Sequence, residues 1–353
     1  MKRAYLTVLL AVCGVAVAQD RPEPTKAQAP TATVNTNPVV TEGDFDVPVE
    51  KLWWVFSTDD GFKMLGAAKA KIDLRVGGKM QSHYNPEGVI GDEGTIENTI
   101  IAYEPNHVLA WRITKPPKNF PFMTAYKDVW CVATFTDAGG GKSHLRLAQI
   151  GYSAEEESQK MRAFFDQGNK WVLDKLQQNL SGRPKDAPKS EQAAASDPLA
   201  PIITEANITA MPADVWKSWT TSDGFKAFLG TENKIELKVG GPFEVYFSME
   251  PPAGQRGSEG CKVLSYEPES MLSFSWNAPP KFKWAREHHT WVVVKILPAG
   301  AHGSKVVLKQ MGFAELAAAA PDHADEVKQV REYFSNAWPH VLEALKDHYT
   351  PAK

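Results

Sequence analysis

The sequence predicts two tandem α+β domains, each with an antiparallel sheet packed against a long C-terminal helix. Three observations support this class: an internal repeat, strand segments that are apolar at alternate residues, and a long amphipathic helix ending each copy. Five blocks recur in one register, 163 residues apart. Solenoid repeats run only about 20 to 50 residues, so this period indicates whole domains. The paired blocks are TDDGFK at 58–63 and TSDGFK at 221–226, Trp53 and Trp216, KIDLRVGG at 71–78 and KIELKVGG at 234–241, YEP at 103–105 and 266–268, and PPK at 116–118 and 279–281.

The N-terminal segment predicts export. Lys2 and Arg3 form a basic start, residues 4–17 are apolar, and AVA at 16–18 is a typical cleavage site. The apolar run is shorter than the roughly 20 residues of an ordinary membrane-spanning helix. We therefore expect a signal peptide at 1–18 and a periplasmic or secreted protein without a transmembrane segment. An uncleaved N-terminal anchor and a lipoprotein anchored at Cys13 are the less favoured alternatives.

Two stretches of low complexity separate the folded parts of the chain. Residues 19–38 and 181–201 are rich in Pro, Ala and small polar residues and show no apolar periodicity. Such composition is typical of flexible, disordered linkers. The sequence therefore places the first domain at 39–180 and the second at 202–350.

Net charge and cysteine content limit the classes of function. The net charge is −3, and it becomes −5 if the signal peptide, with its two basic residues, is removed. A mildly acidic chain lacks the positive surface that neutralises phosphates, which argues against nucleic acid as a partner. Cys131 and Cys261 occupy non-equivalent positions of the repeat, so neither is a repeated ligand or nucleophile. They form either one disulfide or, as we favour, two separate buried thiols.

Each repeat opens in the same way. An apolar strand is predicted at 39–47 and again at 202–210, and Pro48 or Pro212 then starts a short helix. The shared Asp-Gly-Phe-Lys sequence is interpreted as a turn that ends this helix.

A meander of short strands is predicted to follow. Alternating runs are separated by Gly, Pro and Asn turns, and the Gly-Gly pairs at 77–78 and 240–241 suit tight connections between strands. Side chains alternate between the two faces of a strand, so the repeat shows which face is apolar in both copies. The matched positions on that face are Met80, Ser82 and Tyr84 with Phe243, Val245 and Phe247; Leu109, Trp111 and Ile113 with Leu272, Phe274 and Trp276; Cys131, Ala133 and Phe135 with Val292, Val294 and Ile296; and Leu145, Leu147 and Gln149 with Val306, Leu308 and Gln310.

The last helix of each repeat is predicted to cover that apolar face. Apolar residues follow i, i+3, i+4, i+7 spacing over residues 161–176 and 327–345, long enough to cross a sheet. A sheet with one apolar face needs such a cover. Pro339 lies inside the second helix and is expected to kink it or to leave one carbonyl free.

This order of elements resembles the START-like helix-grip superfamily, SRPBCC. The resemblance rests on the Trp of the first helix, the Asp-Gly turn, the Val-Gly-Gly hairpin, the Tyr-Glu-Pro turn, and the Gln-x-Gly-aromatic strand end ahead of a long helix. Within the superfamily, both copies are similar to the branch of activator of heat-shock-protein-90 ATPase homologues. The resemblance implies a curved sheet wrapped around the helix, and a cavity between them for apolar or aromatic ligands. That branch often has histidine where Gln149 and Gln310 stand in this chain.

No classical catalytic or cofactor-binding motif is present, so we assign no catalytic residue, cofactor or metal. The GDEG and GSEG tetrapeptides at 91–94 and 257–260 are interpreted as turns. His288 and His289 are the nearest approach to a metal site, but neighbours on a regular strand point to opposite faces and cannot share one ion. Lys127 and Asp128 replace them in the first copy.

The candidate ligand residues lie on the apolar face. Gln149 and Gln310 are amides at strand ends, and each bonds either a backbone carbonyl or water, or a polar group of a ligand. Aromatic residues beside them either fill the core or enclose a ligand, and His288 is expected to point inward as a core residue or a base. The full candidate set is Tyr84, Trp111, Phe122, Gln149, Phe247, Trp276, His288 and Gln310.

The sequence therefore favours an exported tandem START-like protein that binds a small apolar or amphipathic molecule without transforming it. Two alternatives stay open. An extracytoplasmic protein-interaction module, similar to a co-chaperone, would expose an apolar patch in place of a cavity. A cyclase-like or hydrolase-like enzyme would need convergent acid and base residues in the same cavity.

Overall fold

The computed structural model describes residues 34–181 and 197–350 of the 353-residue chain. The chain divides into two compact units, Met1–Ser190 and Glu191–Lys353. The predicted signal peptide and most of both predicted linkers lie outside the described residues. No helix within the described ranges is long and apolar enough to cross a membrane.

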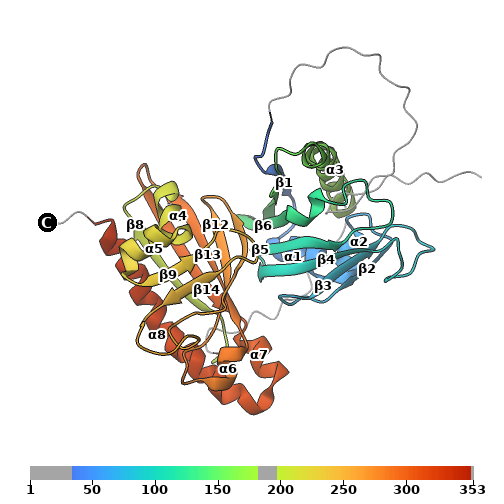
Figure 1. The fold of residues 1–353 in the computed structure, drawn as a ribbon. Helices are drawn as coiled ribbons and strands as arrows, with labels where there is room; N and C mark the ends of the chain where they lie inside the picture. The colour runs from blue at the N-terminus through green and yellow to red at the C-terminus, as the bar shows by residue number, and fades with distance from the viewer. Residues whose placement is uncertain (1–33, 182–196, 351–353) are drawn as a thin grey trace, which may run out of the picture. The chain divides into compact units, whose positions relative to one another are not determined.

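The first unit is an α+β fold in which one antiparallel sheet curls beside a long helix (Figure 1). The strand order is β1-β7-β6-β5-β4-β3-β2, and the long helix packs against β1. In chain order the elements are β1 (Val39–Phe45), α1 (Val49–Ser57), α2 (Asp59–Lys63), β2 (Lys69–Ile72), β3 (Lys79–His83), β4 (Ile96–Glu104), β5 (Val108–Lys115), η1 (Ala125–Asp128), β6 (Trp130–Gly139), β7 (Lys142–Ile150) and α3 (Glu156–Leu180).

The second unit repeats this order with one difference in its sheet. Five strands pair in the order β11-β12-β13-β14-β8, while β10 and β9 form a separate hairpin. In chain order the elements are β8 (Ile202–Ile208), α4 (Pro212–Thr220), α5 (Ser222–Leu229), β9 (Glu232–Ile235), β10 (Phe243–Tyr246), β11 (Val263–Glu267), β12 (Met271–Trp276), α6 (Lys283–Glu287), β13 (Thr290–Ala299), β14 (Gly303–Met311), α7 (Phe313–Ala319), η2 (Pro321–His323) and α8 (Ala324–His348). The predicted tandem α+β class is confirmed.

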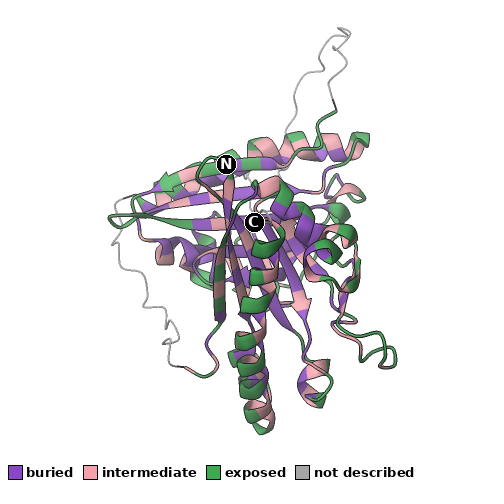
Figure 2. Cartoon of the chain, turned by 90° about the vertical axis from the view of Figure 1, so that its left-hand side faces the viewer, coloured by how far each residue is buried: buried purple, intermediate pink, exposed green. Residues whose placement is uncertain are grey.

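The apolar faces predicted from the repeat form the two cores. Figure 2 shows buried residues running through the strands, while the long helices alternate between buried and exposed positions. Leu272, Phe274 and Trp276 are at most 4% exposed, as are the matched residues Leu109 and Trp111. Phe247 is the exception among the matched positions, because its side chain is 56% exposed.

Both long helices are confirmed, and each spans 25 residues. Their apolar stripes face the sheets: the buried positions include Met161, Phe165 and Leu176 in α3, and Phe334 and Leu345 in α8. Helix α8 continues through Pro339.

The Asp-Gly-Phe-Lys sequence forms a second short helix in each unit, not the predicted turn. The Oγ1 atoms of Thr58 and Thr221 accept hydrogen bonds from the backbone N–H groups of Gly61 and Gly224, at 3.1 and 3.0 Å. These threonines therefore cap α2 and α5, which is why the chain turns back into a helix. A Cβ atom at Gly61 would lie 2.1 Å from the carbonyl oxygen of Trp54, so only glycine fits this close approach.

The Gly-Gly pairs form the predicted connections between strands. Gly77 and Gly240 have φ angles of 80° and 82°, a region that favours glycine. Their N–H groups donate to the carbonyl oxygens of Ile100 and Val263, both at 2.8 Å. Each connection is thereby tied to the strand that follows its hairpin.

Cys261 is a free and buried thiol, so it does not form a disulfide with Cys131. Burial raises the pKa of the Cys261 thiol to about 12, which keeps it protonated and unreactive at neutral pH.

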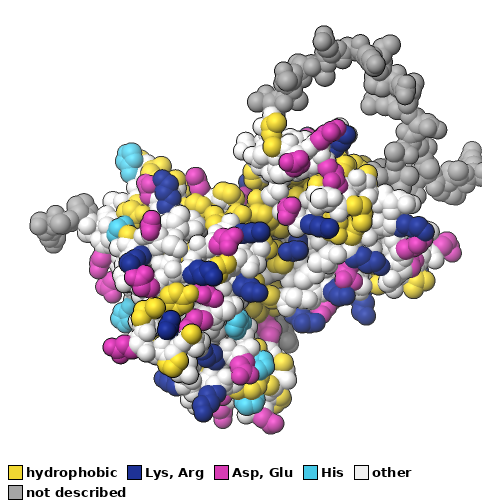
Figure 3. Space-filling view, in the orientation of Figure 1, with side chains coloured by type: hydrophobic (Ala, Val, Ile, Leu, Met, Phe, Trp, Pro, Cys, Tyr) yellow, Lys and Arg dark blue, Asp and Glu magenta, His cyan; other side chains and the backbone are white. Residues whose placement is uncertain are grey.

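The visible surface carries both signs of charge. Lys and Arg side chains are interspersed with Asp and Glu side chains over each unit in Figure 3. On the face shown, the positive side chains therefore do not form one continuous track.

We predict that the two units fold independently, because each has its own sheet, covering helix and apolar core. Separate fragments of residues 34–190 and 191–353 should each unfold cooperatively in a thermal melt followed by circular dichroism. The prediction fails if both fragments lack a cooperative transition while the full chain has one.

Candidate functional site

The sheet of the second unit is interrupted between β10 and β11. In the first unit, the equivalent strands β3 and β4 pair continuously from Lys79 with Thr99 to Ser82 with Ile96. In the second unit this regular ladder is replaced by two isolated bridges, Pro242 with Lys262 and Tyr246 with Gly257, and by further backbone hydrogen bonds. The β10–β11 connection (residues 247–262) is therefore joined to the neighbouring strands by irregular contacts and not by a regular ladder.

A pocket of about 400 Å³ lies beside this connection. Three segments enclose it: the connection itself, the end of β12 with the prolines that follow it, and one face of α8. Its lining residues are Phe247, Ser248, Gln255, Arg256, Gly257, Ser258, Trp276, Asn277, Ala278, Pro279, Pro280, Tyr333, Phe334, Ala337, Trp338, His340 and Val341.

Aromatic rings form the wall of the pocket. The rings of Trp276 and Trp338 have centroids 5.2 Å apart, and Phe334 stacks on Trp338 at 6.1 Å. These three side chains are at most 6% exposed. Phe247 meets Trp276 edge-on at 6.5 Å and is exposed, as is Tyr333. The buried rings thus make the wall, and the exposed rings lie at the rim.

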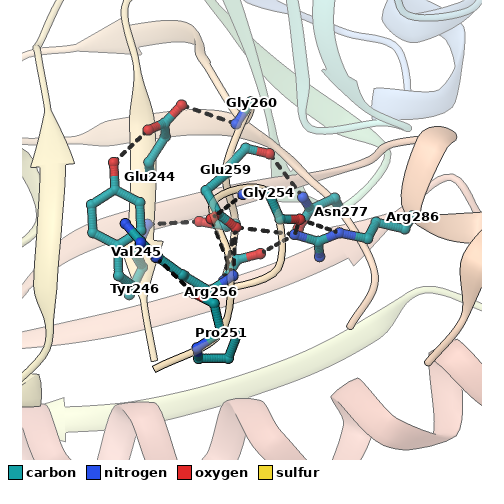
Figure 4. Close-up of polar contacts among 12 residues, drawn as sticks. Glu244, Val245, Tyr246, Pro251, Gly254, Arg256, Glu259, Gly260, Asn277 and Arg286 are labelled. Carbon is teal, nitrogen blue, oxygen red and sulfur yellow. Dashed lines mark hydrogen bonds and ion pairs between the residues drawn. The ribbon is translucent and has the colours of Figure 1, made fainter. Parts of the chain in front are cut away.

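The carboxylate of Glu259 accepts several hydrogen bonds within the β10–β11 connection (Figure 4). Its oxygens accept hydrogen bonds from the backbone N–H groups of Gly254 at 2.8 Å, Arg256 at 3.0 Å and Gly257 at 3.0 Å. Burial acts to raise the pKa of Glu259, but these backbone donors outweigh it and hold the pKa below its usual range. Glu259 is therefore ionised at neutral pH and fixes the shape of the connection.

Arg286 closes this network from helix α6. Its Nη2 atom lies 3.1 Å from Glu259 Oε2, and the two side chains are 14% and 16% exposed. The same guanidinium donates to the carbonyl oxygens of Gly254, Gly257 and Ala278. Arg286 thus joins the connection to the segment after β12, so it positions two of the three sides of the pocket.

The strand-end glutamines link the sheet to the long helix in both units. Gln310 Oε1 accepts a hydrogen bond from Trp338 Nε1 at 2.7 Å, and Gln310 Nε2 donates to Thr290 Oγ1 at 2.8 Å. Gln149 Oε1 accepts from Asn169 Nδ2 at 3.0 Å and from the Tyr152 hydroxyl at 3.1 Å. The partners of Gln310 are thus side chains, and not the backbone carbonyl, water or ligand expected from the sequence. For Gln149, a bond to a backbone carbonyl, water or a ligand stays a prediction.

The structure brings some of the predicted site residues together and separates others. Phe247 and Trp276 line the pocket. Gln310 does not line it, but accepts a hydrogen bond from the indole of Trp338, which does. In the first unit Tyr84, Trp111, Phe122 and Gln149 are all buried. A ligand cavity at those four residues stays a prediction.

The expected inward orientation of His288 is wrong. His288 is exposed, its ring stacks on Trp284 with centroids 4.0 Å apart, and its Nδ1 lies 2.8 Å from the Trp284 carbonyl oxygen. Residues Lys283–Glu287 form helix α6, and β13 begins only at Thr290. The alternation of a strand therefore does not extend back to His288.

Sequence reasoning missed Arg256, Glu259 and Arg286 as parts of the site. Glu259 belongs to the GSEG tetrapeptide, whose relative GDEG contains Glu93. Glu93 is exposed and pairs with Lys118 at 2.7 Å, so the shared motif does not reveal the different environment of Glu259. Among the described residues, no cluster of His, Cys, Asp and Glu could hold a metal ion.

Replacing either strand-end glutamine by leucine should destabilise its own unit by about 1–3 kcal/mol, because buried donors lose their acceptor. Urea unfolding of Gln149→Leu and Gln310→Leu measures this. Gln310→Leu should also shift the fluorescence of Trp338, whose indole N–H loses its partner. A free energy of unfolding that stays within about 0.5 kcal/mol of wild type would contradict the structural role.

Glu259→Gln should destabilise the second unit by about 1–2 kcal/mol, since an amide cannot accept from the same set of donors. The matched change Glu93→Gln, at an exposed site, should stay within about 0.5 kcal/mol. The lowered pKa means that Glu259 stabilises the fold above its unfolded pKa of about 4.3, and that this contribution is lost as pH falls through the folded pKa. Urea unfolding between neutral and acidic pH should show a weaker pH dependence for Glu259→Gln than for wild type. Equal effects of the two substitutions would refute this role for Glu259.

Comparisons with known proteins agree with this architecture. The model of one family, described as Activator of Hsp90 ATPase homolog 1-like protein, matches residues 46–181 and 209–350, once in each unit. No curated protein matches the sequence significantly.

Three of the solved structures that match this chain are the following. Protein MLL2253 from Mesorhizobium loti is 20% identical, with a TM-score of 0.34, and the match covers 42% of this chain and 98% of that one. DynU16, from the dynemicin biosynthetic locus, is 13% identical, with a TM-score of 0.31 and coverage of 89% and 99%. The di-domain ARO/CYC BexL, from the BE-7585A biosynthetic pathway, is 11% identical, with a TM-score of 0.31 and the same coverage.

The family match spans most of the chain and falls on both α+β units. The protein therefore belongs to the Activator of Hsp90 ATPase homolog 1-like family and carries two tandem copies of its domain.

Proposed function

We propose that the second domain binds a small apolar or amphipathic molecule in the pocket beside the β10–β11 connection. The observation that carries this proposal is a pocket of about 400 Å³ walled by Trp276, Phe334 and Trp338. Ligand sites are typically concave, about 300–1,000 Å³ in volume and mostly apolar, with a few polar groups. This pocket has that size and that lining.

Two ionisable groups beside the pocket, Glu259 and Tyr246, are poorly suited to proton transfer, which agrees with binding without chemical transformation. Glu259 is engaged by Arg286 and by backbone N–H groups, so it is not available as a base. Burial and the hydrogen bond to Glu244 raise the pKa of Tyr246 to about 12, so this phenol stays neutral near pH 7. A general acid or base needs a pKa closer to the working pH.

The direct test uses N-phenyl-1-naphthylamine, a neutral aromatic probe whose fluorescence rises in apolar surroundings. Ala337 lines the pocket from α8, so Ala337→Phe should fill the space and weaken probe binding at least about tenfold. The control Ala318→Phe places the same ring on an exposed position of α7 and should leave the affinity unchanged. Lack of binding by wild type, or equal affinities for all three proteins, would overturn the proposal.

We also propose that the protein is exported, on the basis of the signal sequence predicted at residues 1–18. Intact-mass measurement of the protein from its own host tests this. A chain that begins at Gln19 supports export, and a chain that retains residues 1–18 contradicts it.

A further inference from the structure

Arg256 is a positive charge at the pocket that no carboxylate of the described residues neutralises. It lines the pocket and is only partly exposed. Its Nε donates to the carbonyl oxygen of Pro251 at 3.0 Å, which orients the guanidinium. Within residues 34–181 and 197–350, no carboxylate lies within ion-pair distance of its side chain.

The nearby acidic side chains are already engaged. Glu259 pairs with Arg286 at 3.1 Å and accepts backbone hydrogen bonds, including two from the N–H of Arg256 itself. Glu244 accepts from the backbone N–H of Gly260 at 2.9 Å and from the Tyr246 hydroxyl at 2.6 Å. Figure 4 shows both carboxylates in these contacts. Neither carboxylate engages the guanidinium of Arg256, whose side-chain hydrogen bond among the described residues is that of Nε to Pro251.

The chemistry of this arrangement specifies the ligand more closely. A guanidinium is planar and forms paired, charge-assisted hydrogen bonds to carboxylate, sulfonate or phosphate oxygens. The wall formed by Trp276, Phe334 and Trp338 suits a flat ring system. From this juxtaposition we infer that the pocket selects amphipathic organic anions: an aromatic or polycyclic body against the tryptophans, and one acidic group on Arg256.

This inference rests on the proposed ligand-binding function. Two probes distinguish a failure of the inference from a failure of that function. The first, 1-anilinonaphthalene-8-sulfonate, carries a sulfonate, and the second, N-phenyl-1-naphthylamine, has the same ring body without a charge. Arg256→Gln in the full chain should weaken binding of the sulfonate about tenfold, while affinity for the neutral probe stays within about twofold. Arg256→Lys keeps the charge and should retain most of the affinity for the sulfonate.

Arg331→Gln is the matched control. The Nε of Arg331 also donates to a backbone carbonyl, that of Ala200 at 2.6 Å, but the residue does not line the pocket. Its replacement should leave the affinity for both probes unchanged. Added NaCl should weaken binding of the sulfonate to wild type more than to Arg256→Gln.

Each other outcome has a distinct meaning. If wild type binds neither probe, the proposed function itself fails. If the neutral probe binds but Arg256→Gln does not weaken the sulfonate, the inference fails and the function stands. If Arg256→Gln weakens both probes equally, Arg256 only shapes the pocket, and the inference is likewise overturned.

Discussion

The packing of one apolar sheet face against one long helix determines most of this structure. A sheet with a single apolar face is stable only when another layer covers it, and α3 and α8 supply that layer. A buried polar side chain on such a face needs a partner, because an unpaired one costs about 1–3 kcal/mol. Gln149 and Gln310 meet this requirement by bonding to Asn169 and Trp338 on the covering helices. Each bond fixes the helix relative to the end of β7 or β14.

In the second domain, the hydrogen bond between the strand-end glutamine and the covering helix also positions one wall of the candidate site. The bond from Trp338 to Gln310 orients the indole that faces Trp276. The pocket lies between one face of α8 and the end of β12, beside the irregular connection from β10 to β11. The Glu259–Arg286 pair helps to hold this irregular connection in place.

The first domain fixes the equivalent connection by different chemistry. His83 is buried, its Nε2 lies 2.9 Å from Asp92 Oδ1, and its Nδ1 accepts from the backbone N–H of Asn85. Both ring nitrogens are therefore engaged, which indicates a structural role for this pair. Hydrogen bonds from the backbone N–H groups of Val89 and Gly94, together with His83, lower the pKa of Asp92 to about 2 despite partial desolvation. The two copies thus keep one fold while their connections diverge.

The sequence predicted the fold well, because strand alternation and helix periodicity are local properties and each copy provides a check on the other. The burial of Trp276 and Gln310 on the apolar face could be predicted for the same reason, since both lie on regular strands. His288 was misplaced because a helical turn, α6, precedes β13 and breaks the alternation. Arg256, Glu259 and Arg286 could not be identified, because their contacts depend on how an irregular connection folds back on itself.

The central claim is that the second domain holds a small molecule in an aromatic pocket. Native mass spectrometry of the full chain, purified from its own host, tests this most directly. We expect one bound small molecule per chain in wild type, an acidic compound with an aromatic or polycyclic body, and none in Ala337→Phe. The unliganded mass alone in wild type, or an adduct that persists equally in Ala337→Phe, would contradict the account.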